Sequence, residues 1–83
     1  MTNPKKIHIQ YFALLREERG LNEETIETCA RTVLDLYQEL RQKFNFRLPV
    51  ELLKVAVNNE FVSWDTPLKG NDHIVFIPPV AGG

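Results

Sequence analysis

The stretch TVLDLYQELRQKF, residues 32–44, predicts the main helix of this chain. Its apolar side chains recur at the spacing of one helical face, and its polar side chains fall on the opposite face. That apolar face consists of Val33, Leu36, Tyr37, Leu40 and Phe44. Thr32 has the residue type of an N-cap, and Asp35 three positions later forms a variant of the capping box. Pro49 prevents the helix from extending further. A single amphipathic helix of this kind has to bury its apolar face against other elements.

Strand-like segments precede and follow this helix. The expected strands are residues 7–12 (IHIQYF), 23–29, 53–57, 60–62 and 73–78 (HIVFIP). Residues 13–20 are expected to form a turn or one to two turns of helix that end at Gly20, and Asn58-Asn59 is expected to form a hairpin turn. A mixed sheet packed on one main helix is the layout of a β-grasp domain, an α+β fold.

Length and composition limit the possible functions. The 83 residues, of which 43% are hydrophobic and 25% charged, fit one small globular domain without a cleft between two lobes. A net charge of -1 gives no electrostatic reason to expect nucleic acid or an anionic membrane as a partner. No apolar run approaches the roughly 20 residues of a membrane helix, and no secretory signal is visible. Because the single Cys29 cannot form an internal disulfide, we expect a cytoplasmic protein.

The last residues differ in character from the rest of the chain. We expect residues 1–78 to form the domain and residues 79–83 (PVAGG) to form a C-terminal tail. Pro78-Pro79 lacks two backbone donors and favours extended geometry, so the sheet should end there. Gly82-Gly83 would let an enzyme admit the backbone through a narrow channel and hold the terminal carboxylate beside a nucleotide. A frayed end explains Gly-Gly alone more simply, but the stiff Pro-Pro pair favours the functional interpretation.

The parity of the strands predicts an apolar patch on the sheet. The side chains expected to face the helix are Ile7, Ile9, Tyr11, Val55, Val57, Ile74 and Phe76. This leaves Phe12, Ala56, Val75 and Ile77 on the outer face, with Phe61 near them. We expect these residues to form an exposed patch beside the exit of the tail, where partner proteins dock in turn. A loop over the patch, or a bulge that resets the parity of one strand, would remove it.

Other candidate residues carry weaker information. His8 and His73 share the outward parity, but two histidines without a third ligand are not expected to bind a metal. Cys29 has no Cys-x-x-Cys partner and is expected to be a small core residue. Five glutamates near Arg16 and Arg19 are expected to form a solvated face with them: Glu17, Glu18, Glu23, Glu24 and Glu27.

Several short motifs near both ends of the chain are similar to those of a known protein family. They are residues 57–62 (VNNEFV), Asp65, Pro67-Leu68, Gly70-Asn71-Asp72 and 74–83 (IVFIPPVAGG), together with Tyr11-Phe12-Ala13, Arg16-Glu17 and Gly20 near the start. In these stretches the chain resembles the small subunit of molybdopterin synthase, one of the ubiquitin-like sulfur carriers. The ending Phe-x-Pro-Pro-Val-Ala-Gly-Gly is specific within those carriers, whereas a bare Gly-Gly end is common to all of them.

The resemblance implies a ubiquitin-like sulfur carrier that is not a catalyst by itself and binds no cofactor. An ATP-using, ubiquitin-activating-like adenylyltransferase would adenylate the carboxylate of Gly83, and a sulfur donor would convert it to a thiocarboxylate. The tail would thread into the large synthase subunit within a heterotetramer, and the thiocarboxylate would give sulfur to cyclic pyranopterin monophosphate to form molybdopterin. The threading residues would be Pro79, Val80, Ala81 and Gly82. The partner-binding residues would be Phe12, Phe61, Val75 and Ile77, and Arg16 is either a further contact or a surface residue.

Two other function classes remain open. A related carrier would serve thiamine synthesis, tRNA thiolation or cysteine synthesis, or would modify proteins through a bond between Gly83 and lysines. A β-grasp binding module would use no terminal chemistry.

Overall fold

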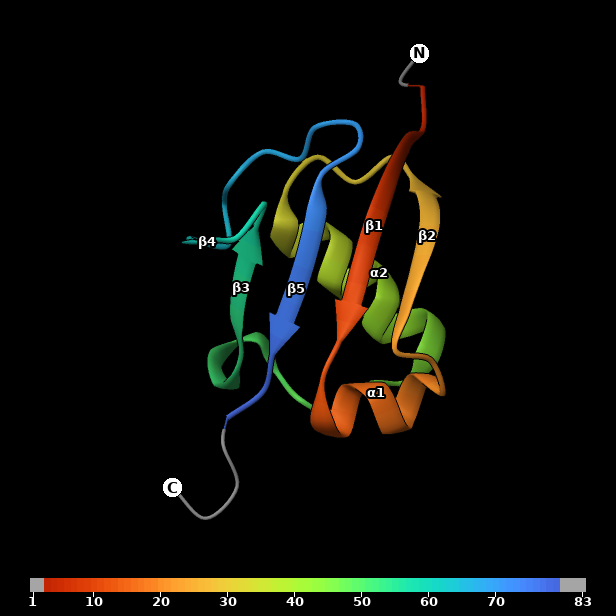
Figure 1. Ribbon diagram of the computed structural model, residues 1–83, viewed down its shortest axis with the longest axis vertical. Coiled ribbons are helices and arrows are strands. Elements are labelled where there is room, and N and C mark those ends of the chain that lie inside the picture. Colours follow the sequence, from red (N-terminus) through yellow and green to blue (C-terminus); the bar gives the residue numbers. More distant parts are fainter. Residues whose placement is uncertain (1–2, 80–83) are drawn as a thin grey trace.

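The computed structural model describes residues 3–79, which form a five-stranded mixed sheet with one long helix on one face (Figure 1). The strands are β1 (Lys5–Tyr11), β2 (Glu23–Thr28), β3 (Lys54–Val57), β4 (Glu60–Val62) and β5 (His73–Ile77). The helices are α1 (Ala13–Arg19), α2 (Val33–Phe44) and the short 3-10 helix η1 (Val50–Leu52). The expected order of elements is confirmed, and so is the β-grasp architecture. The 3-10 turn is an addition that the sequence pattern did not predict.

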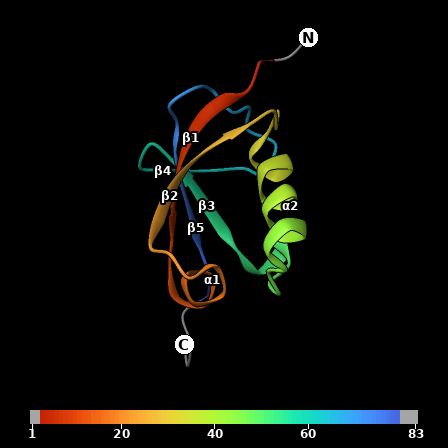
Figure 2. The same cartoon turned by 90° about the vertical axis from the view of Figure 1, so that its right-hand side faces the viewer.

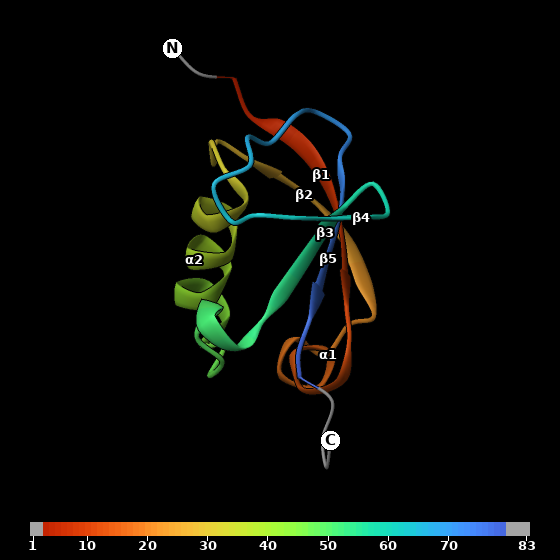
Figure 3. The same cartoon turned by 90° about the vertical axis from the view of Figure 1, so that its left-hand side faces the viewer.

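The strand order is β2-β1-β5-β3-β4, so the first and last strands are neighbours at the centre of the sheet. β1 and β5 run parallel, with His8 opposite His73 and Tyr11 opposite Phe76. The other three pairings are antiparallel. In the two edge-on views, α2 packs against one side of the sheet, and no helix of residues 3–79 lies on the other side (Figures 2 and 3). One sheet face is therefore available for contacts outside the domain.

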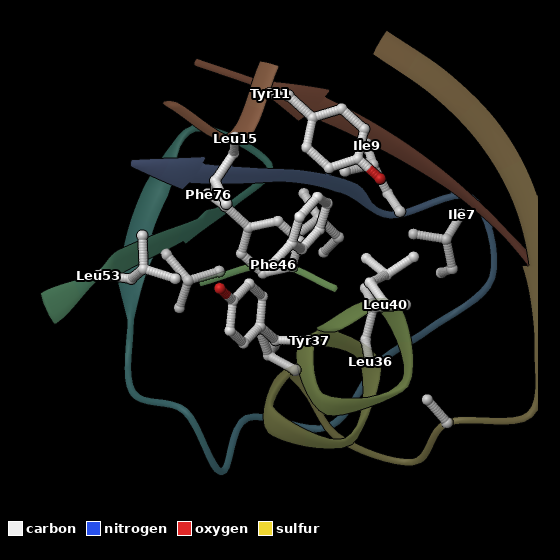
Figure 4. Close-up of a cluster of buried hydrophobic side chains, with 14 of the residues drawn as sticks. Ile7, Ile9, Tyr11, Leu15, Leu36, Tyr37, Leu40, Phe46, Leu53 and Phe76 are labelled. Carbon is white, nitrogen blue, oxygen red and sulfur yellow. The ribbon is translucent and has the colours of Figure 1, made fainter. Parts of the chain in front are cut away.

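The core lies between α2 and the inner face of the sheet (Figure 4). The expected inward residues of β1 and β5 are all buried, as are four of the five residues on the predicted helical face; Phe44, the fifth, is half-buried. Tyr37 of α2 contacts the rings of Phe46, Trp64 and Phe76 at centroid distances of 5.2 to 6.1 Å. Burial of each large apolar side chain contributes about 1.5–3 kcal/mol, so this face determines where the helix sits. The predicted inward parity is confirmed, except that Val57 is only half-buried. Phe12, expected to be the last residue of the first strand, lies outside it, because β1 ends at Tyr11 and Phe12 is the N-cap of α1.

Local sequence determines where several elements end. The hydroxyl of Thr32 accepts a hydrogen bond from the backbone N–H of Asp35 at 3.2 Å, which confirms the predicted N-cap of α2. Gly20 ends α1 in the left-handed conformation with φ 81°, where glycine avoids the penalty of a side chain. Asn58 and Asn59 both have positive φ, which is the geometry of a two-residue hairpin turn between β3 and β4.

One sequence-based expectation about the core is wrong. Cys29 is exposed. The inward position beside it belongs to Thr28, whose hydroxyl donates to Glu39 Oε1 at 2.9 Å and accepts from the backbone N–H of Ala30 at 3.0 Å. A satisfied hydroxyl is tolerated in a buried position, and the alternation of the chain then turns Cys29 outward.

The expected solvated face around Arg19 is also partly wrong. Arg19 donates two hydrogen bonds of 2.8 Å to the carboxylate of Glu24, and the Tyr11 hydroxyl donates a third of 2.7 Å. The Arg19 guanidinium lies 3.9 Å from the ring centroid of Phe44. We call these four residues the Arg19 clamp, because together they join α1 to β1, β2 and α2. Hydrogen bonds from Arg19 lower the pKa of Glu24, while burial raises the pKa of Tyr11 far above its usual range.

The clamp predicts a pH-dependent contribution to stability. Because the pKa of Glu24 is lowered in the folded state, its stabilising effect is fully present above the ordinary value of 4.5 and is lost as the pH falls through the lowered pKa. We expect Glu24→Gln to lower the free energy of unfolding by about 1–3 kcal/mol at neutral pH and by less in acid. Urea unfolding followed by the fluorescence of Trp64 measures this. Glu23→Gln, an exposed position on the same strand, is the control. If the loss in free energy of unfolding caused by Glu24→Gln is as large in acid as at neutral pH, the ionised Glu24 carboxylate is not what stabilises the clamp.

Candidate functional site

The candidate site surrounds the point where the chain leaves the sheet after β5. Ile77 ends this strand opposite Lys54 of β3. On the other side β1 ends at Tyr11, opposite Phe76, so Phe12 follows beside Ile77. Pro78 is buried and Pro79 is exposed. The parallel pairing thus places the start of α1 and the exit of the chain at the same end of the molecule (Figure 1).

A groove of about 800 Å³ lies on the α1 side of this exit. It is lined by Phe12, Ala13, Leu14, Arg16, Glu17, Leu48, Ile77, Pro78 and Pro79. We call it the α1 groove. Most of its lining is apolar, with Arg16 and Glu17 as the charged members. Exposed apolar surface of this kind is typical of a protein-binding site.

The buried hydroxyl of Tyr37 supports Leu48 in the α1 groove. It donates a 2.6 Å hydrogen bond to the backbone carbonyl of Leu48. Burial raises the pKa of Tyr37 to about 12, so the hydroxyl keeps its proton throughout the physiological range. The core residue therefore holds part of the groove in place.

A second groove of about 430 Å³ lies on the β3 side of the exit. Its lining is Glu51, Leu52, Leu53, Lys54, Phe61, Ile77, Pro78 and Pro79. We call it the β3 groove. Phe61 is 69% exposed, and the Lys54 ammonium lies 5.9 Å from its ring centroid. Ile77, Pro78 and Pro79 line both grooves, so the last described residues separate them.

Of the predicted partner-binding residues, Phe12, Phe61 and Ile77 line these grooves, whereas Val75 lies further along β5 and lines neither. Phe12 is 39% exposed, Phe61 is more exposed, and Val75 and Ile77 are half-buried. Ala56 shares their face but is buried, so it is not part of an exposed patch. It lies opposite Phe61 on one side and Val75 on the other, so two larger side chains flank it. Among the predicted tail residues, Val80, Ala81, Gly82 and Gly83 lie outside the described residues.

Sequence reasoning missed several apolar residues of the site, among them Leu14, Leu48 and Leu52. Leu14 and Leu52 are exposed and line the α1 and β3 grooves, and Leu48 is half-buried in the α1 groove. None belongs to a strand, so the parity of strands could not place them. The sequence signal for Leu14 was the pair of adjacent leucines in the short segment ALLREER, because neighbouring residues of a helix point in different directions and only Leu15 is buried.

The two histidines share the outer face, and the pairing of β1 with β5 makes them neighbours, but they are remote from the chain exit. His8 and His73 lie opposite each other on the outer face of β1 and β5, and His8 Nδ1 lies 2.9 Å from the Thr25 hydroxyl. Within residues 3–79 no group of three or more His, Cys, Asp or Glu side chains is arranged to hold a metal ion. In the same part of the chain, no helix is long and apolar enough to cross a membrane.

The sequence profile of the ThiS family matches residues 9–83. The chain belongs to this family. Among curated relatives of this ThiS-family protein, the molybdopterin synthase sulfur carrier subunit of Escherichia coli (strain K12) is 36% identical, with 93% of this chain and 99% of the relative covered. The molybdopterin synthase sulfur carrier subunit of Mycobacterium tuberculosis (strain H37Rv) is 32% identical, with 94% and 98% covered.

Solved structures agree with this family assignment. A putative molybdopterin converting factor subunit 1 from Pyrococcus furiosus superimposes with a TM-score of 0.74 at 34% identity, covering 92% of this chain and 99% of its own. One chain in the complex of subunits 1 and 2 of the molybdopterin-converting factor from Helicobacter pylori 26695 gives 0.66 at 25% identity, with 94% and 99% covered. The ubiquitin of Caldiarchaeum subterraneum, at 16% identity, a TM-score of 0.63 and coverage of 96% and 99%, shares the ubiquitin-like fold alone.

The backbone of Ala13 predicts an unusual response to substitution in the α1 groove. Ala13 has φ 51°, a left-handed conformation that disfavours a side chain. We expect Ala13→Val to lower the free energy of unfolding by about 1–2 kcal/mol, because a β-branched side chain is worst in this region. Ala13→Gly relieves the strain and should be at least as stable as the wild type. Urea unfolding of the three proteins tests this order, and equal stability of the valine variant and the wild type would contradict it.

Proposed function

We propose that this protein is the sulfur carrier subunit of a molybdopterin synthase. The observation that carries the proposal is its relationship, over nearly its whole length, to curated proteins with that name in several bacteria. The chain ends in the Pro-Pro-Val-Ala-Gly-Gly sequence, and two apolar grooves flank the start of that sequence. A carrier needs such a combination, because its reactive end has to enter an enzyme while its domain binds outside.

In the proposed reaction the reactive group is the terminal carboxylate of Gly83. An oxygen of the carboxylate attacks the α-phosphorus of ATP, pyrophosphate leaves, and an acyl adenylate forms. Sulfur at the oxidation level of sulfide, released as hydrosulfide from a donor, then attacks the acyl carbon, AMP leaves, and a thiocarboxylate remains. In the large subunit the thiocarboxylate sulfur forms a bond to a carbon of cyclic pyranopterin monophosphate. Water then hydrolyses the acyl–sulfur bond, which leaves the sulfur on the pterin and returns the carboxylate of Gly83. ATP binds to the activating adenylyltransferase, so this chain needs no cofactor of its own.

The proposed docking surface consists of Phe12, Phe61, Val75 and Ile77. Phe12 and Phe61 stand on opposite sides of the chain exit, and each lines one of the two grooves. Burial of an aromatic side chain at the centre of an interface commonly dominates its energy. The H. pylori complex of subunits 1 and 2 supports a large subunit as one partner. We propose that the adenylyltransferase uses the same surface at a different time, because the tail can enter one enzyme at a time.

Sulfur loading of the terminal glycine is the first prediction of this proposal. After incubation with the adenylyltransferase, ATP and a sulfur donor, intact-protein mass spectrometry should show the mass increase of one oxygen replaced by sulfur. Deletion of Gly83 should abolish the increase. Gly82→Ala should slow it, since a side chain obstructs a narrow channel. Gly70→Ala is the matched control, because the space around this exposed glycine is open and its φ is unstrained.

The outcomes separate the function classes. Absence of the sulfur increment in the wild type would exclude a carrier and favour a binding module without terminal chemistry. Bonds between Gly83 and lysines of other proteins, detected as branched peptides, would favour a protein modifier. Capture of a thiamine, tRNA-thiolation or cysteine-synthesis enzyme in place of the large synthase subunit would favour a different carrier pathway.

The docking surface generates the second prediction. Phe12→Asp or Ile77→Asp should weaken binding to the large subunit about tenfold or more, because a carboxylate would be desolvated in an apolar interface. Isothermal titration calorimetry measures the affinity, and circular dichroism verifies the fold. Leu21→Asp is the matched control, since Leu21 is 40% exposed and lines neither groove. If Phe12→Asp and Leu21→Asp bind the large subunit with equal affinity, Phe12 is not part of the docking surface.

A further inference from the structure

The α1 groove has one wall whose position depends on a weakly anchored helix. Five of its lining residues lie between Phe12 and Glu17, at the start of α1. This helix has seven residues, and only Leu15 among them is buried. It begins at the strained Ala13. A helix this short has little stability of its own, so tertiary contacts have to hold it in place.

Among the described residues, two ion pairs connect α1 to other parts of the chain, and they differ in solvent exposure. In one, the Arg47 guanidinium lies 3.5 Å from Glu18, but the Arg47 side chain is 86% exposed; Glu18, which is 14% exposed, also accepts a hydrogen bond of 3.3 Å from the backbone N–H of Arg47. Exposed pairs contribute little to stability. In the other, Arg19 and Glu24 are 23% and 13% exposed and are joined by two hydrogen bonds. A two-pronged guanidinium–carboxylate pair fixes orientation as well as distance.

The Arg19 clamp also restrains α1 from several directions. Glu24 lies on β2 and is held in turn by the hydroxyl of Tyr11 on β1. Phe44, under the guanidinium, belongs to the last turn of α2. Arg19 itself belongs to the last turn of α1. The C-terminal end of α1 is therefore tied to three elements, whereas its N-terminal end presents Phe12 and Leu14 to the groove.

We propose that Arg19 is a positioning residue for partner docking, which acts by holding α1 so that Phe12 and Leu14 form the wall of the α1 groove. The inference rests on the proposed function, because partner affinity is the property that it affects. Arg19 does not line the groove; it acts through the helix. The clamp thereby couples a partly buried ion pair to the shape of the docking surface.

The test compares Arg19→Met with Arg47→Met, which makes the same substitution in the weak ion pair. Isothermal titration calorimetry with the large synthase subunit should give a Kd about tenfold higher for Arg19→Met and unchanged for Arg47→Met. In sulfur loading by the adenylyltransferase, the KM of Arg19→Met should rise by a similar factor while kcat stays constant. A purely structural role would reduce the amount of folded protein and would not separate KM from kcat. Arg19→Lys keeps the positive charge but cannot make the two parallel hydrogen bonds of a guanidinium, so its affinity for the large subunit should lie between those of Arg19→Met and the wild type.

A measurement that needs no partner keeps this inference separate from the proposed function. In amide chemical-shift spectra, Arg19→Met should shift the signals of Phe12 and Leu14, whereas Arg47→Met should not. If the wild type binds no large subunit, the proposed function fails, and the shifts still test the positioning role. The inference is overturned if Arg19→Met has the same Kd and KM as the wild type and the amide signals of Phe12 and Leu14 do not shift. If Arg19→Met does not fold, the same measurements on Arg19→Lys decide.

Discussion

The parallel pairing of β1 with β5 at the centre of the sheet is the constraint on which the rest of the structure depends. Parallel neighbours place their carboxyl ends at the same edge and require a long crossover between them. The crossover contains α2, which covers one face of the sheet (Figure 2). The shared edge places Phe12 and α1 beside Pro78 and Pro79, where the chain leaves the sheet. The site around the exit is thus a direct consequence of strand topology.

Because α2 covers only one face of the sheet (Figure 2), the core and the proposed docking surface lie on different parts of the molecule. The inner face holds the aromatic and aliphatic core that fixes α2, including the contacts of Tyr37 with Phe46, Trp64 and Phe76. Large apolar residues at the chain exit, such as Phe61, remain exposed because no element of the described chain covers them. Such a distribution suits a protein that binds partners in succession, since its fold does not depend on the surface that each partner covers.

The two sides of the exit are built differently. On the β3 side, the groove draws on β3, β4 and η1 together with the end of β5, and Lys54 and Phe61 face each other across neighbouring strands. On the α1 side, the groove wall is a short helix that begins in a strained conformation and is tied down at its far end by an ion pair. Hydrogen bonds to charged groups contribute more than neutral ones when they are partly shielded from water. A polar cluster therefore shapes one half of an apolar surface.

The sequence by itself determined the features that depend on neighbours along the chain: the cap and apolar face of α2, the alternation of β1 and β5, the Asn58-Asn59 turn, and the Pro-Pro pair at the end of the sheet. Tertiary structure decided the burial of Ala56 between Phe61 and Val75, the exposure of Cys29, and the contact of Arg19 with Glu24 and Phe44. It also brought Leu14 and Leu48 into one groove. Periodicity reports only which way a side chain points. Whether it is then covered depends on the size and charge of residues that another strand or helix brings against it.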